Sequence, residues 1–200
     1  MAKFDEEARK ERGAMIAKQY RGIYPAYEAF YIHSIIYAAE RSEAAFQRFD
    51  EAVVASKSPV LIFATIQEAL THAGALSRFF WPVRTDNRLA AARGDRLRGA
   101  FALNDTSALK GRKLRNAFEH FDEDLDRFLL GDRAGYFFPS PQVGDQALAD
   151  EAIGHIFKLV DPERGVCVLL GEKFEFRPIR GEVRRILFRA WEMDEQGGRL

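Results

Sequence analysis

The sequence predicts a mainly α-helical fold: a helical bundle with a small antiparallel β-meander and a terminal helix in its last third. Three observations predict it. Two long segments before residue 82 repeat apolar residues at three- and four-residue spacing, which is the period of an amphipathic helix. A third such segment precedes Gly131, and beyond residue 155 short alternating runs are typical of strands. With 47% hydrophobic residues, a 200-residue chain can bury one sizeable core.

The first two helices are expected before residue 55. Residues 4–20 form a charged segment of helical composition, which Gly22 and Pro25 should end. An apolar stripe then continues from residue 27 to 53, or about seven turns. This length predicts one long helix of a bundle.

A second long helix is expected to begin at Ser58, because a serine followed by Pro59 is a typical helix start. Its apolar stripe continues to Phe80, and the helix must end before Pro82. The short connection between the two long helices predicts that they pack antiparallel to each other.

The stretch 84–103 is rich in arginine and contains Gly94 and Gly99, so we expect one or two short helices with solvated basic side chains rather than a continuous helix. Ser107 is a candidate cap for the next helix. The apolar positions of that helix repeat until Gly131 stops it.

The clearest linker candidate is the segment 135–144, which contains Pro139 and Pro141. We therefore divide the chain into a helical bundle, residues 1–134, and a second unit, residues 145–200, packed on the bundle. Three short strands are expected in the second unit, at 156–160, 166–170 and 173–177.

A terminal helix is expected over residues 180–193. It should bury Val183, Ile186, Leu187 and Trp191. Three short strands cannot cover their own apolar face, so this part of the chain is expected to pack on the helices or on a partner.

The overall charge excludes a protein that binds nucleic acid through a globally basic surface, because 30 Lys and Arg residues balance 30 Asp and Glu residues. The charges are segregated locally, however. From residue 84 to 115 there are nine basic and three acidic residues, and five acidic side chains follow from Glu119 to Asp126. Any affinity for nucleic acid would have to come from this local segregation of charge.

The beginning of the chain, MAKFDEEARKER, lacks the apolar segment of a secretory signal, and the nearly apolar run 29–39 is too short to span a bilayer. We expect a cytoplasmic protein with no membrane partner. A single cysteine, Cys167, excludes an intrachain disulfide and a cysteine-based zinc cluster. Its alternating setting predicts a small buried residue.

Four polar residues stand out on the helix expected before Gly131: Arg115, Asn116, Glu119 and His120. At about 100° per residue, the apolar positions of this helix share one stripe, and Arg115 and His120 flank that stripe on opposite sides. Asn116 and Glu123 lie on the outer surface between them. These side chains are therefore candidates for a functional site rather than for the core.

Arg115, four residues and then His120, with the polar Asn116 directly after the arginine, resemble the motif of the HEPN superfamily. The wider string LKGRKLRNAFEHFDEDLDRF is similar to HEPN-like bacterial proteins, and the resemblance covers about residues 25–130. It implies a helical bundle that forms a homodimer in which two motifs face each other. It also implies a metal-independent ribonuclease without a cofactor, although other members bind RNA or protein without cutting.

The resemblance assigns roles to single residues. His120 would act as general base or acid on the ribose 2′-OH, since imidazole exchanges protons near neutral pH. Arg115 would hold the scissile phosphate and stabilise charge on its oxygens. Asn116 would orient the imidazole or donate to phosphate, and Glu119 and Glu123 would support the site. The products would carry a 2′,3′-cyclic phosphate, and DNA would resist cleavage because it lacks the attacking hydroxyl.

Partners follow from the same resemblance. RNA is the expected substrate, and a toxin–antitoxin or defence setting would add an antitoxin or other regulatory protein as partner. Five basic side chains are the expected RNA contacts: Arg112, Lys113, Arg93, Arg96 and Arg98.

Other interpretations remain open. The chain can be a noncatalytic RNA- or protein-binding module, and the motif can be an ordinary helix surface with pairs from Arg115 to Glu119 and from His120 to Asp124. His72, four residues after Glu68, has the spacing of two metal ligands on one helix face. His33 is interpreted as an interior histidine rather than a ligand.

Overall fold

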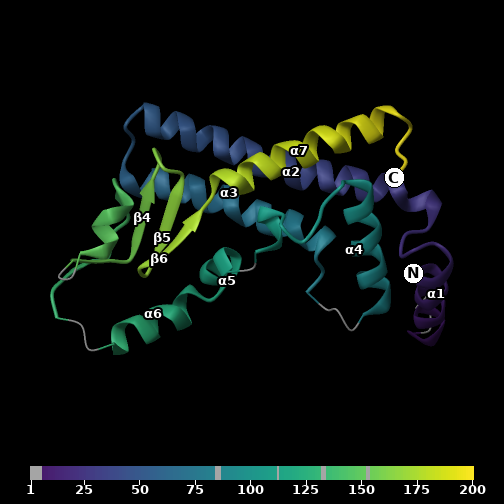
Figure 1. Ribbon diagram of the computed structural model, residues 1–200, viewed down its shortest axis with the longest axis horizontal. Coiled ribbons are helices and arrows are strands. Elements are labelled where there is room, and N and C mark those ends of the chain that lie inside the picture. The colour runs from purple at the N-terminus through teal and green to yellow at the C-terminus, as the bar shows by residue number, and fades with distance from the viewer. Residues whose placement is uncertain (1–5, 84–86, 112, 132–133, 152–153) are drawn as a thin grey trace.

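The computed structural model describes residues 6–83, 87–111, 113–131, 134–151 and 154–200, with the backbone alone at residues 114 and 115. Helices dominate it, so the predicted mainly α fold is confirmed (Figure 1). The α-helices are α1 (Glu6–Gln19), α2 (Glu28–Val54), α3 (Pro59–Phe80), α4 (Arg88–Ala100), α5 (Lys113–Glu119), α6 (Phe121–Leu130) and α7 (Arg177–Glu195).

The two long helices α2 and α3 form the frame of the protein, as the periodicity predicts. The Ser58 hydroxyl caps α3 by accepting from the backbone N–H of Leu61, and Pro59 is the first residue of the helix. Midway along the pair, the buried Ser42 Oγ of α2 donates to the carbonyl oxygen of Ala69 in α3, at 2.9 Å. The two helices are therefore packed along their length and not only at the connecting turn.

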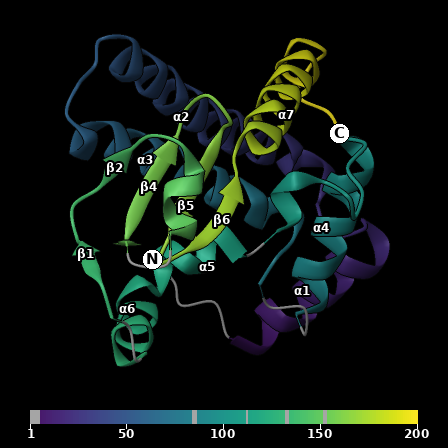
Figure 2. The ribbon, with the colours of Figure 1, turned by 60° about the vertical axis from the view of Figure 1, so that its left-hand side comes forward.

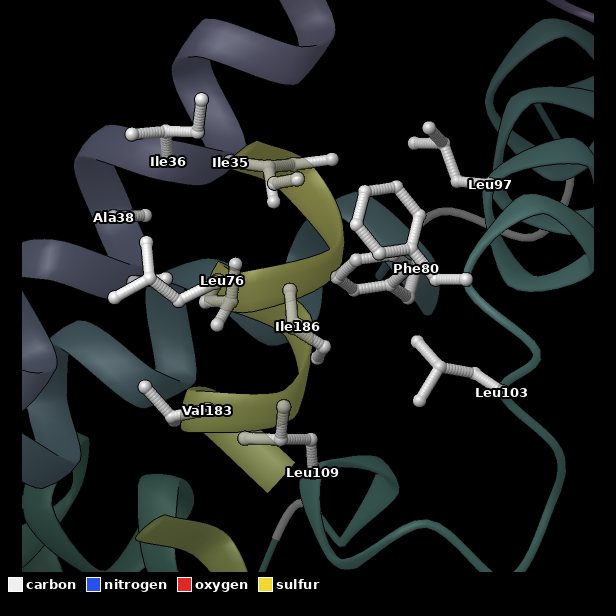
Figure 3. Close-up of a cluster of buried hydrophobic side chains, with 14 of the residues drawn as sticks. Ile35, Ile36, Ala38, Leu76, Phe80, Leu97, Leu103, Leu109, Val183 and Ile186 are labelled. Atoms are coloured by element: carbon white, nitrogen blue, oxygen red, sulfur yellow. The ribbon is translucent and has the colours of Figure 1, made fainter. Parts of the chain in front are cut away.

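Helix α7 packs against α2 and α3 although it lies at the other end of the sequence (Figure 1). Its side chains Val183 and Ile186 are fully buried, next to Ile35 of α2 and Leu76 of α3 (Figure 3). The α4 side chain of Leu97 reaches the same cluster. This first core cluster therefore joins residues from both sides of the boundary predicted at 135–144.

A four-stranded sheet lies beside α3 (Figure 2). Its order is β2 (Gln142–Val143), β4 (Lys158–Asp161), β5 (Val166–Leu169) and β6 (Glu172–Glu175). The predicted antiparallel meander is confirmed, since β4 pairs with β5 and β5 with β6 in antiparallel register.

Strands also occur inside the predicted linker. β2 pairs in parallel with β4, and β1 (Tyr136–Phe138) pairs in parallel with β3 (Gly154–Ile156) in a separate small sheet. Strands β1 and β2, which lie in the predicted linker, are each three residues long or shorter, and the prolines at 139 and 141 separate them. Runs this short carry no readable alternation, which is why the sequence predicts a linker here.

A second core cluster joins the sheet to the α2–α3 pair. Cys167 of β5 is fully buried in it, with Phe46 of α2 and Phe63 of α3. Phe176, which directly precedes α7, stacks edge-on against Phe49 with ring centroids 5.6 Å apart. The predicted packing of the C-terminal segment on the helices is thus present in both core clusters.

The prediction of an interrupted arginine-rich stretch is wrong, because α4 runs continuously through Gly94 and Gly99. Gly94 is buried, and a Cβ there would lie 2.7 Å from the carbonyl oxygen of Phe80 and 2.9 Å from Pro82. This glycine allows a close approach of α4 to the end of α3, and packing offsets its low helix propensity.

The helix predicted from Ser107 to Gly131 is divided. Ser107 caps only the short 3₁₀ helix η2 (Ala108–Lys110), and Gly111 then adopts an extended conformation before α5. A second break separates α5 from α6 at His120. Leu109 of η2 is buried in the first core cluster, so tertiary packing fixes η2 apart from α5.

Two side chains lie outside the core against expectation. Trp191 of α7 is 44% exposed, because Ala190 and Met193 take the core-facing positions at that end of the helix. His33 of α2 is exposed rather than interior, and its Nε2 lies 3.1 Å from Asp194 Oδ1 of α7.

Helix α3 is long and apolar enough, by length and composition, to cross a membrane. In the folded chain, α2 covers one side of α3, and α4 and the sheet cover other parts of it. Of its most apolar 18-residue stretch, 56% is buried. Core helices of soluble proteins have the same composition.

Ion pairs tie α7 to α2 at the edge of the second core cluster. The carboxylate of Glu43 accepts from Arg184 at 2.7 Å and from Arg180 at 3.3 Å, and Arg180 also donates to Asp50. Burial of Glu43 opposes its ionisation, but the bonds from Arg184 and Arg180 outweigh it and hold the pKa of Glu43 below its ordinary value. The arginines therefore favour the docked position of α7.

Replacing each of the two glycines of α4 by alanine should change the free energy of unfolding in opposite directions. Gly94→Ala is expected to lower the free energy of unfolding by ~1–3 kcal/mol, because the added methyl group meets backbone atoms of Phe80. Gly99→Ala meets nothing within 4 Å and should raise it by ~0.5–1 kcal/mol through helix propensity. Urea unfolding of both variants measures this. Equal effects would contradict the close approach of α4 to α3.

Loss of the Glu43 carboxylate should destabilise the protein in a pH-dependent way. Glu43→Gln is expected to lower the free energy of unfolding by ~1–3 kcal/mol at pH 7, since two charge-assisted bonds are weakened. Because the pKa of Glu43 is lowered on folding, its stabilisation is present above the ordinary value of 4.5 and is lost as pH falls through the folded value.

Urea unfolding of Glu43→Gln and wild type between pH 3 and 8 measures this pH dependence, with the exposed Glu40→Gln on the same helix as control. The difference between wild type and Glu43→Gln should shrink towards the acidic end. A difference that stays constant with pH would show that the ion pairs do not contribute.

Candidate functional site

The candidate site lies on α5 and α6, which extend along one side of the protein below the sheet in Figure 1. α5 packs against α3, and Ala117, Phe118 and Phe121 are partly buried against the second core cluster. These are apolar positions of the stripe recognised in the sequence. The opposite face of the two helices, with Asn116 and His120, is exposed.

His120 lies at the break between α5 and α6. Its backbone angles, φ −116° and ψ 28°, depart from the helix, yet its N–H still donates to the Asn116 carbonyl at 2.8 Å. The N–H of Asp124 donates to the His120 carbonyl at 3.0 Å, so the chain is kinked and not unwound. The kink presents the imidazole at the surface, where its side chain is 55% exposed.

A carboxylate of α6 lies near the imidazole of His120. Its Nδ1 lies 3.8 Å from Glu123 Oε1, so the predicted neighbour Asp124 is not the residue that pairs with it. Asp124 instead pairs with Arg127 at 3.1 Å, and Glu123 lies 3.8 Å from the same guanidinium. Arg127 therefore offsets part of the acidic charge beside His120, a role that the four-residue spacing from Glu123 indicates in the sequence.

Glu119 is turned towards the bundle. Its carboxylate pairs with Arg78 of α3, and each side chain is nearly half exposed. The predicted pair of Glu119 with Arg115 lies outside the described side chains. The partner Arg78 went unrecognised in the sequence because it is distant along the chain. Glu119 thus holds α5 against α3.

The structure describes some of the remaining motif residues in full and others in part or not at all. Asn116 is exposed on the same face as His120, one helical turn before it. The backbone of Arg115 belongs to α5, while its side chain and the whole of Arg112 lie outside the described part of the chain. Lys113 is exposed at the first position of α5.

The arginines of α4 do not join this group. α4 packs against α1 and α3, away from α6 (Figure 1). Arg96 donates to the carbonyl oxygens of Tyr20 and Ile23 at 2.8 and 2.6 Å and pairs with the buried Glu28. The prediction that this guanidinium is solvated is therefore wrong, because it satisfies the carbonyls of the turn between α1 and α2.

Two further α4 arginines are also partly buried. Arg98 donates to the carbonyl of Phe80, pairs with Asp95 and lies over the Trp81 ring, 5.9 Å from its centroid. Arg93 has a buried Nε without a hydrogen-bond partner among the described residues. The predicted RNA contacts at 93, 96 and 98 are thus separated from His120.

Lys158 of β4 is a neighbour of the site that the sequence does not suggest. Its Nζ lies over the ring of Phe121, 4.3 Å from the centroid, and 5.9 Å from that of Phe63. This cation–π contact holds the start of α6 against the sheet. A cleft of about 270 Å³ between α6 and β5–β6 is lined in part by Asp124, Arg127 and Glu172.

The other candidate chemistries receive less support. His72 Nε2 lies 3.7 Å from Glu68, but that carboxylate also accepts from Arg48 at 2.7 Å. Within the described ranges, no group of three or more His, Cys, Asp or Glu side chains converges as a metal site would require. Burial raises the pKa of Cys167 to about 12, which disfavours the thiolate and confirms its interpretation as a small buried residue.

Comparison with known proteins adds no relative: no family model, no curated protein and no solved structure matches this chain.

The contact between Arg78 and Glu119 should be measurable as a coupling. In a double-mutant cycle with Arg78→Ala and Glu119→Ala, we expect a coupling free energy of ~0.2–1 kcal/mol, because both side chains are partly exposed. Chemical unfolding at low and high salt measures it, and the coupling should fall at high salt. A coupling of zero at low salt would contradict the assignment of Glu119 as the tie between α5 and α3.

Proposed function

We propose that the chain is a metal-independent endoribonuclease of HEPN type that acts through Arg115 and His120. The observation that carries the proposal is the exposed imidazole of His120 at the kink between α5 and α6, five residues after Arg115 on the same helical path. An imidazole that is open to solvent and fixed at a helix break can reach a ribose hydroxyl. The packed apolar face of α5 and α6 holds it in place.

The proposed reaction is an attack of the ribose 2′-oxygen on the adjacent phosphorus. His120 removes the 2′-proton as the new 2′-oxygen–phosphorus bond forms, and the bond from phosphorus to the 5′-oxygen breaks. A protonated imidazole or water supplies the proton that the leaving 5′-oxygen takes up. The products are a 2′,3′-cyclic phosphate and a free 5′-hydroxyl, and no oxidant or metal is consumed.

Neighbouring residues have distinct roles in this proposal. Arg115 binds the scissile phosphate, and Asn116, on the same exposed face as His120, orients the imidazole or donates to phosphate. Glu123, 3.8 Å from the imidazole, supports the site by helping to hold the ring in position, while Glu119 positions α5 through its ion pair with Arg78. Arg112 and Lys113 would contact the flanking RNA.

The proposal extends to the setting of the protein. We propose a cytoplasmic homodimer, since a second motif would supply a second imidazole and further positive charge against the acidic first turn of α6. An antitoxin or other regulatory protein fits a toxin–antitoxin or defence role. Arg96 and Arg98 are left out of the RNA surface, because their guanidinium groups already bind carbonyl oxygens and carboxylates.

A second candidate is a noncatalytic module that binds RNA or protein with the same fold. The observation that favours it is the open position of His120 beside the acidic residues of α6, since carboxylates repel phosphate. Neither function involves a cofactor in this proposal.

The central test of the enzyme is cleavage of total RNA in EDTA, with a matched all-DNA strand as second substrate. Wild type should cut only RNA, and His120→Ala should lower the rate by ~10²–10⁴-fold, because a general base is removed. His155→Ala is the control, since it deletes a histidine beside α6 that lies outside the motif. Mapping of the fragment ends should show cyclic phosphate.

Three outcomes separate the candidates. Equal cleavage of RNA and DNA would contradict attack by the 2′-hydroxyl. No cleavage, together with RNA binding that weakens as salt is raised, would favour the binding module. Neither cleavage nor binding would leave Arg115 and His120 as an ordinary helix surface.

A further inference from the structure

The cleft between α6 and the β5–β6 hairpin is a second surface beside the candidate site. Its volume is about 270 Å³, slightly below the ~300–1,000 Å³ of sites that hold drug-sized molecules. A single planar group therefore fits it better than a longer ligand does. Charged side chains line one part of the cleft and apolar side chains another: Asp124, Arg127, Glu172, Phe128, Leu169 and Leu170.

The cleft opens next to His120. At about 100° per residue, Asp124 lies ~40° and Arg127 ~20° around the helix from His120, so the three side chains share one side of α6. The N–H of Asp124 donates to the His120 carbonyl at 3.0 Å, so this helical turn persists through the kink. The cleft therefore begins one turn, or ~5.4 Å, from the imidazole that is proposed to act on the ribose. A base attached to that ribose can enter it.

Leu170 is held beside the cleft in an unfavourable backbone conformation. Leu170 and Gly171, with φ of 49° and 86°, form the loop between the paired residues Leu169 and Glu172. Asparagine, aspartate or glycine usually occupies the first position of such a loop, because a left-handed backbone is costly for other residues. The Leu170 N–H donates to the Phe157 carbonyl at 2.8 Å, which fixes the loop. Strained positions cluster at functional sites, and this one presents a large apolar side chain to the cleft.

The charged side chains of the cleft offer both donors and acceptors. Asp124 holds Arg127 at 3.1 Å, and the guanidinium has five N–H donors, so some remain for a ligand. Lys173, the cation next to Glu172 in β6, pairs with Asp150 at 2.5 Å. The Glu172 carboxylate is thus left without an ion pair among the described residues. A ligand in the cleft meets an oriented fork of donors and an available carboxylate.

We propose that the cleft binds guanine, as the base of the nucleotide whose 2′-hydroxyl attacks. The inference rests on the proposed ribonuclease for the reaction and adds a base preference to it. Guanine has two adjacent donors, N1–H and N2–H, which one carboxylate can accept, and two adjacent acceptors, O6 and N7, which match an arginine fork. Glu172 accepts from the donor pair, and Arg127 donates to the acceptor pair. Leu170 packs on the ring.

The other bases match these groups less well. Adenine and cytosine each place a ring acceptor beside their amino donor, and that acceptor would face the Glu172 carboxylate. Uracil has a single N–H between two carbonyl oxygens. Phosphate is repelled by Asp124 and Glu172, so the RNA backbone stays outside the cleft. The carboxylates near His120 therefore select a base instead of only opposing the substrate.

Mapping of cleavage ends tests the base preference. With single-stranded RNA of mixed sequence, wild type should cut on the 3′ side of guanosine and leave guanosine 2′,3′-cyclic phosphate. Glu172→Gln should lower the rate after guanosine by ~5–150-fold, the range for one bidentate base contact, and leave cleavage after other bases unchanged. Glu175→Gln is the control, because it changes another exposed glutamate of β6 that does not line the cleft. Thermal melts check that both variants are folded.

Binding to uncut strands tests the cleft without the reaction. Fluorescence anisotropy compares oligodeoxythymidine strands that carry one central deoxyguanosine, deoxyinosine or deoxyadenosine. Deoxyinosine lacks the N2 amino group and keeps the other hydrogen-bonding atoms of guanine. Wild type should bind the deoxyguanosine strand ~5–150-fold more tightly than the deoxyadenosine strand. Glu172→Gln should remove the difference between deoxyguanosine and deoxyinosine, and Glu175→Gln should retain it.

The outcomes separate this inference from the proposed function. Equal cleavage after all four nucleotides, or equal binding of the deoxyguanosine and deoxyinosine strands, would overturn the guanine site. RNA cleavage that shows no base preference would do so while leaving the ribonuclease intact. A preference for the deoxyguanosine strand that Glu172→Gln removes, in a protein that leaves RNA uncut, would refute the ribonuclease and support the guanine site.

Discussion

The packing of α7 against α2 and α3 is the interaction on which the rest of the structure depends. Val183, Ile186 and Ala190 are fully buried in the first core cluster, where they cover apolar side chains that the two long helices would otherwise expose to water (Figure 3). β6 ends at Glu175, two residues before α7, so the docked helix also fixes the edge of the sheet. The sheet in turn places β5 against α2 and α3.

The candidate site depends on the same contact through η2. Leu109 is buried beside α7, its carbonyl accepts from Ser77 of α3 at 2.7 Å, and Ser107 donates to Glu182 of α7 at 3.0 Å. α5 begins just after this anchor, and Glu119 ties its far end to α3. His120 therefore lies at a defined place on the surface, although the ionic contact of its side chain among the described residues is the long one with Glu123.

Sequence patterns predict the parts of this fold that repeat locally. The stripes of α2 and α3, the Ser58 cap and the meander all follow from period and turn chemistry. The failures lie where distant residues decide. Gly94 faces the Phe80 carbonyl, and Arg96 reaches the carbonyls of the turn after α1. Local sequence therefore predicts neither that α4 is continuous nor that its arginines are partly buried. At the site, the exposure of His120 was predictable from the helical period. The kink between α5 and α6 and the ion pair of Arg78 with Glu119 were not.

The central claim is that the two core clusters form one cooperative unit closed by α7. Native-state hydrogen exchange measures this most directly, because it gives an opening free energy for each amide. Amides in the middle of α2, in β5 and in α7, for example those of Ile35, Val168 and Ile186, should open with the same free energy as global unfolding. Exchange of α7 and β5 at a clearly lower free energy than α2 would contradict the account, since the C-terminal segment would then be a separate unit resting on an independently stable bundle.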